Sequence, residues 1–313
     1  MKHAFVFPGQ GSQSVGMLAS LSTAYPIVKQ TFEEASEILG HDLWTLTQEG
    51  PKDILNQTDK TQPALLAAGV AVWRVWQQQQ GSLPILMAGH SFGEYSALVC
   101  SEALNFQDAI RLAQDRGRFM QRAVPEGDGA MAAILGLKDE QMVEICTQVA
   151  QQQIVSTVNF NAPGQIVIAG HTAAVQRAIA QAKTAGARRA VLLQVSVPAH
   201  SDLMRPAADQ MAERLGKVII KTPKIPVLHN VDVSAKSAPD EIRRALAAQL
   251  YNPVRWVETI EKMVAEGVMM LFESGPGKVL TGLNKRIART VIAKPIMDPK
   301  TLEQALQALE APV

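Results

Sequence analysis

The sequence contains little cysteine, no excess of charge of one sign and no long hydrophobic run. Its two cysteines, Cys100 and Cys146, form no C-x-x-C pair, which argues against a disulfide framework or a zinc knuckle, and we expect no metal site. Cys100 lies in an apolar run and is expected to be a buried, unreactive thiol. The 30 basic and 29 acidic residues leave a net charge of +1, which gives no reason to expect a nucleic acid or an anionic membrane as partner.

The apolar runs are short. The run that follows His3 ends at Pro8 and is too short for a signal peptide. The longest, Ala64 to Trp73, ends at Arg74 and falls well below the roughly 20 residues that span a bilayer. We therefore expect a cytoplasmic protein with no membrane or nucleic-acid partner, and we take a monomer as the default.

What the sequence does contain is enough apolar material for a large core. The chain has 313 residues, of which 47% are hydrophobic, and this size suits two lobes. Strand-like runs such as HAFVF, LPILMAG, IPVLHNVDV and GVMMLFESGPG alternate with helical segments. This alternation predicts a mostly parallel sheet with helices on both faces.

Residues 127–197 follow a different order. Their pattern predicts strand, helix, strand, a Pro163-Gly164 turn, strand, helix and strand, at residues 130–137, 139–151, 154–161, 165–169, 172–185 and 190–197. This βαββαβ order is typical of a ferredoxin-like fold. We predict a small subdomain inserted into a large domain formed by residues 1–126 and 198–313, with a ligand cleft between the two.

The segment Gly89-His90-Ser91-Phe92-Gly93 matches the G-x-S-x-G pattern of a nucleophile elbow. An apolar run precedes it and a helix-forming run follows, as a strand–turn–helix requires. The large domain is therefore predicted to be α/β-hydrolase-like, with Ser91 as nucleophile. The backbone N–H of Phe92 would lie at a helix N-terminus, where it could stabilise an oxyanion.

A serine nucleophile requires a general base, and two histidines remain candidates. His200 lies just beyond the predicted junction of the subdomains, whereas His229 lies in an apolar strand and could be an ordinary core residue. His90 adjoins Ser91 and is predicted to have a supporting role. Asp202 is too close in sequence to His200 to orient it, and no acidic partner stands out.

Arg116 lies on the apolar face of a predicted helix that Asn105 caps, while Arg111, Arg118 and Arg122 lie on the opposite face. A buried guanidinium is costly unless it meets an anion. The alternatives are an internal salt bridge, a side chain that reaches solvent, or a bidentate clamp on a substrate carboxylate, and we favour the clamp.

Two glycine-rich loops resemble phosphate-binding motifs without matching them. In FPGQGSQSVG the glycine spacing fails the dinucleotide pattern, and Met17 stands where a P-loop requires lysine. We expect this loop to approach Ser91 and the backbone N–H of Gln10 to be a second oxyanion donor. SGPGK, at residues 274–278, could meet a phosphate at a helix N-terminus, but a tight turn is the simpler interpretation.

Several motifs taken together carry a resemblance to a known family. Arg116 and the segments FVFPGQGSQ, TQPAL, GHSFGEYSALV, NFNAPGQIVIAG, VPAHSDLM, NPVRW and ESGPGKVLTGL occur in this sequence over roughly residues 3 to 290. They resemble the malonyl-CoA:acyl-carrier-protein transacylases of bacterial-type, dissociated fatty acid synthesis. Phe92 departs from the leucine that is commoner in the family, and Ser101-Glu102 replaces an Ala-Gly pair.

The resemblance implies a role for each candidate residue. Ser91 would carry the malonyl group, His200 would be the general base, and Arg116 would bind the malonyl carboxylate. The backbone N–H groups of Gln10 and Phe92 would form the oxyanion hole. The backbone carbonyl of Gln249 would orient the histidine in place of an acid.

The implied reaction is a ping-pong transfer from malonyl-CoA to the phosphopantetheine thiol of acyl carrier protein, with the CoA thioester as substrate and no further cofactor. Carrier proteins are acidic, so basic residues near the cleft should receive one; candidates are Arg188, Arg189, Lys285 and Arg286. A serine hydrolase and a non-catalytic acyl-binding module remain the alternatives. Serine hydrolases with this elbow place their residues in the chain order serine, acid, histidine, with the histidine usually late. Here no clear acid precedes His200, which argues against a hydrolase.

Overall fold

The computed structural model describes residues 1–195 and 197–310. Its larger sheet has the strand order β7-β2-β1-β8-β9, and every neighbouring pair is parallel. The strands are β1 (His3–Phe7), β2 (Leu86–Gly89), β7 (Val227–Leu228), β8 (Met270–Ser274) and β9 (Ile292–Ile296). The expected parallel sheet is thereby confirmed.

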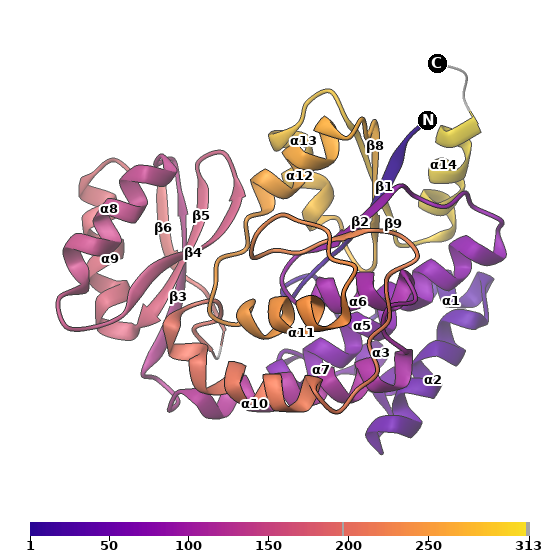
Figure 1. The fold of residues 1–313 in the computed structure, drawn as a ribbon, viewed down its shortest axis with the longest axis horizontal. Helices are drawn as coiled ribbons and strands as arrows, with labels where there is room; N and C mark the ends of the chain where they lie inside the picture. Colours follow the sequence, from indigo (N-terminus) through magenta and orange to yellow (C-terminus); the bar gives the residue numbers. More distant parts are fainter. Residues whose placement is uncertain (196, 311–313) are drawn as a thin grey trace.

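Helices cover both faces of this sheet (Figure 1). Side chains of β1 alternate between two cores: Phe5 and Phe7 belong to one, and Ala4 and Val6 to the other. The first core includes residues of α2 (Ile27–Leu39), α5 (Thr58–Gln78), α6 (Gly93–Cys100), α7 (Phe106–Ala123), α10 (Arg205–Leu215), α11 (Pro239–Ala248) and α14 (Pro299–Glu310). The second includes residues of α12 (Trp256–Ala265) and α13 (Val279–Ile287). The remaining helices on this side of the molecule are α1 (Ala19–Ala24), α3 (Leu43–Glu49) and α4 (Lys52–Leu55).

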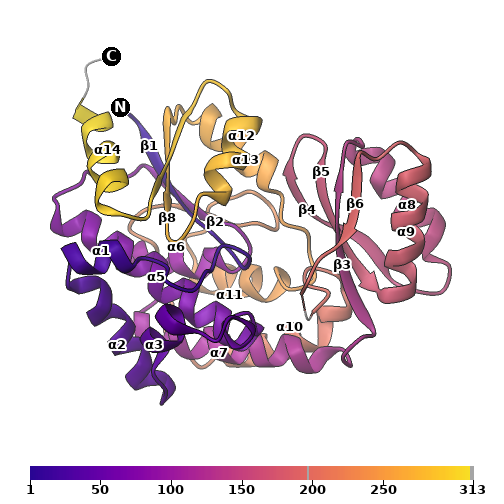
Figure 2. The same cartoon turned by 180° about the vertical axis from the view of Figure 1, so that it is seen from behind.

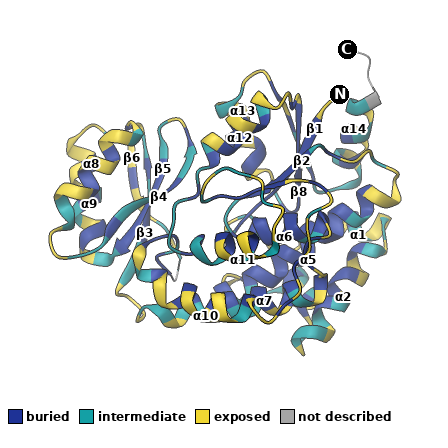
Figure 3. Cartoon of the chain, viewed as in Figure 1, coloured by how far each residue is buried: buried dark blue, intermediate teal, exposed yellow. Residues whose placement is uncertain are grey.

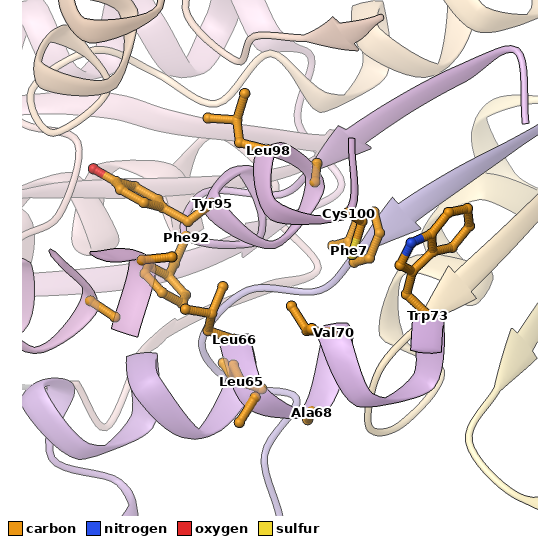
Figure 4. Close-up of a cluster of buried hydrophobic side chains, with 14 of the residues drawn as sticks. Phe7, Leu65, Leu66, Ala68, Val70, Trp73, Phe92, Tyr95, Leu98 and Cys100 are labelled. Atoms are coloured by element: carbon orange, nitrogen blue, oxygen red, sulfur yellow. The ribbon is translucent and has the colours of Figure 1, made fainter. Parts of the chain in front are cut away.

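Helices α5 and α6 form the support beneath the elbow. Figure 4 shows Phe92 close to Leu66 of α5 within this buried cluster. Cys100, at the end of α6, is buried and forms no disulfide, and burial raises the pKa of its thiol well above the usual value. The expectation of an unreactive thiol agrees with this environment.

A smaller unit stands beside the larger sheet (Figure 2). It consists of β3 (Gly129–Leu135), α8 (Asp139–Ala150), β4 (Val155–Ala162), β5 (Gln165–His171), α9 (Thr172–Thr184) and β6 (Arg189–Leu192). The sheet order is β4-β5-β3-β6, with antiparallel neighbours. Helices α8 and α9 pack on it through their apolar faces and expose the opposite faces (Figure 3).

Two predicted strands are shorter than expected. β6 ends at Leu192, whereas the sequence pattern extended it to residue 197; residue 196 lies outside the described residues. β7 contains only two residues, because the chain turns at His229, whose backbone carbonyl accepts the N–H of Val233 at 3.0 Å. An apolar run alone does not reveal such a turn.

The smaller unit is also joined to the larger one by backbone hydrogen bonds. The N–H of Phe160 donates to the carbonyl of Val254 at 3.0 Å, and the N–H of Val254 donates to the carbonyl of Val158 at 2.9 Å. These bonds form an isolated parallel bridge between Asn159 and Val254. The units therefore meet at a third point besides the two chain crossings.

Within the described residues, no helix is long and apolar enough to span a membrane.

Candidate active site

Ser91 lies at the turn between β2 and α6 with a left-handed backbone (φ 51°). The two flanking glycines have no room for a side chain. A Cβ atom on Gly89 would lie 1.8 Å from the carbonyl carbon of Gly93, and one on Gly93 would lie 2.1 Å from the carbonyl oxygen of Phe7. The turn thus requires glycine at both positions, and strain of this kind is a common feature of functional sites.

The hydroxyl of Ser91 meets the ring of His200. The distance from Ser91 Oγ to His200 Nε2 is 2.7 Å. On the other side of the ring, Nδ1 lies 2.7 Å from the backbone carbonyl oxygen of Gln249. A carbonyl can only accept, so Nδ1 carries the proton and Nε2 presents a lone pair to the serine. Burial, followed by the nearby charge of Arg116, lowers the pKa of His200 to about 3.

The other two candidate histidines point elsewhere. His229 is fully buried, and its Nδ1 lies 2.6 Å from Oε1 of Glu94. The Nε2 atom of His90 lies 2.7 Å from Oδ1 of Asn161 on β4, and its ring packs against Trp256. The structure therefore brings His200, and not His229, to the serine hydroxyl, and His90 links the elbow to the smaller unit.

Arg116 is 1% exposed, so its side chain does not reach solvent. Its Nη2 donates to Oε1 of Gln249 at 3.0 Å and its Nη1 to Sδ of Met120 at 3.2 Å, while Nε has no hydrogen-bond partner. The guanidinium carbon lies 5.7 Å and 5.8 Å from the ring centres of Phe92 and Tyr95. Among residues 1–195 and 197–310 no carboxylate forms an ion pair with it, which leaves the guanidinium able to bind an anion.

A cavity of about 220 Å³ joins these groups. Gln10, Ser91, Arg116 and His200 line it from the larger unit. The smaller unit contributes a second wall, made of Met131, Asn159, Asn161, Gln165, Val167, Leu193 and Val195. The predicted cleft therefore lies between the two units and is lined by Ser91, His200 and Arg116.

The two residues whose backbone N–H groups are expected to bind an oxyanion, Gln10 and Phe92, also line this cavity. Phe92 is the N-cap residue of α6, and the first N–H groups of a helix have no partner within it. The loop of Gln10 approaches the elbow closely, since a Cβ atom on Gly9 would lie 2.5 Å from the carbonyl oxygen of His90. The loop of Gln10 and the start of α6 therefore lie on the same side of the elbow, as the sequence prediction requires.

Comparison with known proteins shows which family this chain resembles. Residues 4–291 match the family model described as acyl transferase domain. The malonyl CoA-acyl carrier protein transacylase of Escherichia coli strain K12 is 58% identical over 304 residues, which cover 97% of this chain and 98% of that protein.

Solved structures show the same likeness. An acyl carrier protein S-malonyltransferase from Vibrio cholerae superposes with a TM-score of 0.96 at 56% identity, covering 97% of this chain and 100% of that one. A malonyl-transacylase solved in complex with its type II PKS acyl-carrier protein has a TM-score of 0.97 at 56% identity and covers 98% and 100%.

This chain belongs to the malonyl CoA-acyl carrier protein transacylase family. Family membership agrees with the resemblance found in the sequence motifs and with the mixed α/β architecture.

Within the described residues, no group of histidine, cysteine or acidic side chains has the arrangement of a metal site. The N-terminus of α13, after the SGPGK loop, is occupied by Glu273, which accepts the N–H groups of Leu280 and Thr281 at 3.0 Å and 2.7 Å.

Sequence reasoning missed two polar residues that hold the elbow of this transacylase-family chain. Asn230 accepts the N–H of Ser91 at 2.7 Å and donates to the carbonyl of Gly89 at 2.7 Å. Glu94, in the first turn of α6, is fully buried. The signal that singled out Arg116, a charged residue among apolar neighbours, applies equally to Glu94. Asn230 is uncharged and follows a short strand, so it carries no such signal.

Proposed function

We propose that this chain transfers a malonyl group from malonyl-CoA to the phosphopantetheine thiol of acyl carrier protein through a malonyl ester on Ser91. The supporting observation is the combination within one cavity of a serine–histidine pair and a buried guanidinium without a carboxylate partner. The serine and histidine suit acyl transfer, and the guanidinium suits the free carboxylate of a malonyl group.

In the first half-reaction, Nε2 of His200 takes the proton of Ser91 Oγ as the oxygen attacks the thioester carbon. The negative charge then forms on the former carbonyl oxygen, within reach of the N–H groups of Gln10 and Phe92. Collapse of this intermediate breaks the C–S bond, and the proton held by His200 passes to the departing thiolate of CoA.

In the second half-reaction, the thiol of the carrier's phosphopantetheine attacks the malonyl-serine ester. His200 takes the thiol proton and returns it to Ser91 Oγ as the ester bond breaks. Water could take the place of the thiol, so the partition between carrier and water distinguishes a transferase from a hydrolase.

Arg116 would hold the malonyl carboxylate in both half-reactions. The carbonyl of Gln249, in the place that an acid takes in a triad, suits this substrate because a further carboxylate near Ser91 would repel the malonyl group. No metal or redox cofactor is needed for the steps above, since each is a proton transfer or an acyl transfer.

The acidic carrier would dock on basic residues near the cleft. Arg188, Arg189, Lys285 and Arg286 are exposed. Arg286 on α13 also reaches the smaller unit, donating to Oε1 of Gln165 and, at 3.1 Å, to the carbonyl of Pro163. Gln165 lines the cavity, and this contact supports a docking surface that spans both units.

We further infer that residues 127–197 form a ferredoxin-like subdomain inserted into an α/β-hydrolase-like domain made of residues 1–126 and 198–313. The strand order β4-β5-β3-β6 and the strand–elbow–helix at Ser91 support these assignments. We infer a monomer located in the cytoplasm.

The first experiment is intact-protein mass spectrometry after brief mixing with malonyl-CoA, for the wild type and for Ser91→Ala, followed by addition of holo acyl carrier protein. A malonyl-sized gain only in the wild type, then transferred to the carrier, is the expected result. Loss of the group at the same rate without carrier would make the chain a hydrolase. No gain at all, together with no labelling by a serine-directed fluorophosphonate, would make it an acyl-binding module.

A further inference from the structure

Glu94 is a buried carboxylate for which the reaction above has no use. Both of its oxygens are hydrogen-bonded within the protein. Oε1 lies 2.6 Å from Nδ1 of His229, and Oε2 lies 3.0 Å from the backbone nitrogen of Asn230 and 2.8 Å from Nε2 of Gln249. Burying a carboxylate is costly because it loses its hydration, and these hydrogen bonds offset that cost, so the residue is expected to have a task.

The hydrogen-bond pattern fixes the orientation of the Gln249 amide. Arg116 can only donate, so the atom of Gln249 that faces it is the oxygen; the backbone carbonyl of Ser91 can only accept, so the atom that faces it, at 3.0 Å, is the nitrogen. Oε2 of Glu94 therefore receives two N–H donors, one from this amide and one from the backbone of Asn230, and carries no proton.

The tautomer of His229 follows from the same accounting. Its Nε2 is buried and has no hydrogen-bond partner among the residues that the structure describes. A buried N–H without an acceptor costs more than a buried lone pair without a donor, so the proton lies on Nδ1 and points at Oε1 of Glu94. Both oxygens of Glu94 then accept, and the carboxylate is ionised.

From Glu94, single residues lead to each of the reacting groups. Through Asn230 it reaches the backbone N–H of Ser91. Through Gln249 it reaches Arg116 by the side chain and His200 by the backbone carbonyl. Nucleophile, base and carboxylate clamp are thus attached to one buried anion by groups of fixed orientation.

We propose that Glu94 is the positioning residue of this site and the counter-ion of Arg116, acting through the side-chain amide of Gln249. The intervening amide separates the two charges. Glu94 therefore offsets the charge of the guanidinium without taking up its N–H donors. Arg116 remains charged and open to a substrate carboxylate. This inference rests on the proposed function, because it assumes that Arg116 binds an anionic acyl group.

The electrostatics agree with this arrangement. Burial lowers the pKa of Arg116, while Tyr95 and, after it, the charge of Glu94 act in the opposite direction. A direct Glu94–Arg116 pair would stabilise the guanidinium further but would compete with the malonyl carboxylate for the same donors. An anion held one amide away avoids this competition.

The test compares Glu94→Gln with the wild type. The substitution keeps the size of the side chain but removes its charge and places an N–H group against His229 or against the Gln249 amide. We expect the rate of Ser91 malonylation, measured by intact-protein mass, to fall roughly tenfold to a hundredfold. The preference for malonyl-CoA over acetyl-CoA should fall as well, and fluorophosphonate labelling of Ser91 should slow.

Glu273→Gln is the matched control. Glu273 is also buried, with 1% exposure, and accepts the N–H groups of Leu280 and Thr281 and the hydroxyl of Thr281, but it has no hydrogen bond to Ser91, His200, Arg116 or their direct partners. The Glu273→Gln substitution should lower thermal stability and leave the preference for malonyl-CoA over acetyl-CoA unchanged. If Glu94→Gln behaves in the same way, with wild-type preference and labelling, Glu94 is only a structural residue and the proposal is wrong.

A second variant covers the case in which Glu94→Gln does not fold. If Glu94 is the counter-ion of Arg116, the double variant Glu94→Gln/Arg116→Met removes both charges and should recover a cooperative unfolding transition. Failure of the double variant to fold would overturn the proposal. If the wild type takes up no malonyl group, the proposed function fails, while fluorophosphonate labelling still reports whether Glu94 positions Ser91.

Discussion

Arg116 carries its charge into the interior, where an amide oxygen, a thioether sulfur and two aromatic rings surround it. These groups tolerate a guanidinium but do not neutralise it. A ligand carboxylate would add the charge-assisted hydrogen bonds that the site lacks. The charge of the acyl group is therefore expected to be recognised at this one residue.

Arg116→Ala should lower transfer from malonyl-CoA on the order of 10²-fold, because hydrogen bonds to a charged group are lost. Transfer from acetyl-CoA should be affected much less, since acetyl has no carboxylate. Paired steady-state assays with the two thioesters give the ratio. An unchanged malonyl preference would show that the carboxylate is bound elsewhere.

The depressed pKa of His200 makes a prediction about pH. A general base must be neutral to accept the proton of Ser91, and a pKa of about 3 keeps His200 neutral down to low pH. The rate of fluorophosphonate labelling of Ser91 should therefore stay level from pH 8 to pH 5, where a histidine of ordinary pKa would already be mostly protonated. A midpoint close to 6.5 would contradict the buried geometry. In Arg116→Ala the midpoint should move upward, since the charge of Arg116 is one cause of the depression.

At this scale the sequence indicated the residues that line the candidate site better than the residues that hold them in place. Ser91 follows from its glycines, and Arg116 from its place on an apolar helix face. The local pattern favoured His200 over His229 only weakly without the family resemblance, because the choice depends on which ring reaches a serine more than a hundred residues away. Asn230 was missed for the same reason: its partners at the elbow are 139 residues distant in the chain.

The elbow and the loop of Gln10 form the next level of organisation. The two meet at a contact so close that only glycine fits at position 9, with His90 on the other side. The N–H of His90 also donates to the carbonyl of Phe7 at 2.9 Å, which ties the elbow to the strand that leads into this loop. The distance between the two proposed oxyanion donors, Gln10 and Phe92, is therefore set by backbone contacts.

Gly9→Ala should separate this loop from the elbow while the fold persists, because Gly9 lacks the left-handed φ that would exclude alanine. Loss of one well-placed oxyanion donor costs about 10²-fold to 10³-fold, and a partial displacement should cost roughly tenfold or more in the malonylation rate. Gly282→Ala, in α13, is the control, since nothing lies within 4 Å of the added Cβ atom. An unchanged rate in Gly9→Ala would remove Gln10 from the oxyanion hole.

Element types were predictable where the pattern was periodic. The order of the six elements of the smaller unit, and most of their bounds to within one or two residues, follow from alternation and turn residues. The errors lie at β6 and β7, where apolar residues continue beyond the last strand residue. After Leu192, the N–H of Leu193 still donates to the carbonyl of Met131 at 2.9 Å, and Leu193 and Val195 both line the cavity, so apolar residues beyond the end of β6 do not mark a longer strand.

The molecule as a whole keeps several histidines buried and neutral. Burial lowers the pKa of His3, His90 and His200 in the folded state. Below about pH 6.5 the unfolded chain takes up protons that these side chains refuse when folded, so the free energy of unfolding should fall as the pH drops. His200 alone should account for about 2 kcal/mol between pH 8 and pH 5.

Urea unfolding at pH 8, 6.5 and 5 measures this dependence. Burial raises the pKa of Glu273, which acts in the opposite direction at low pH. The decisive comparison is therefore between the wild type and His200→Asn. The free energy of unfolding of His200→Asn should fall less between pH 8 and pH 5. An equal fall in the two proteins would mean that His200 accepts a proton in the folded protein.

The backbone bridge between Asn159 and Val254 has a consequence for building chimaeras of this family. The bridge itself consists of peptide N–H and carbonyl groups at Val158, Phe160 and Val254, and these groups are present whatever the side chains are. Residues 127–197 from one relative should therefore dock on the larger unit of another without a matching set of side chains at this point. The cavity wall that the smaller unit supplies would be exchanged with it, while the serine, the base and the clamp would keep their places.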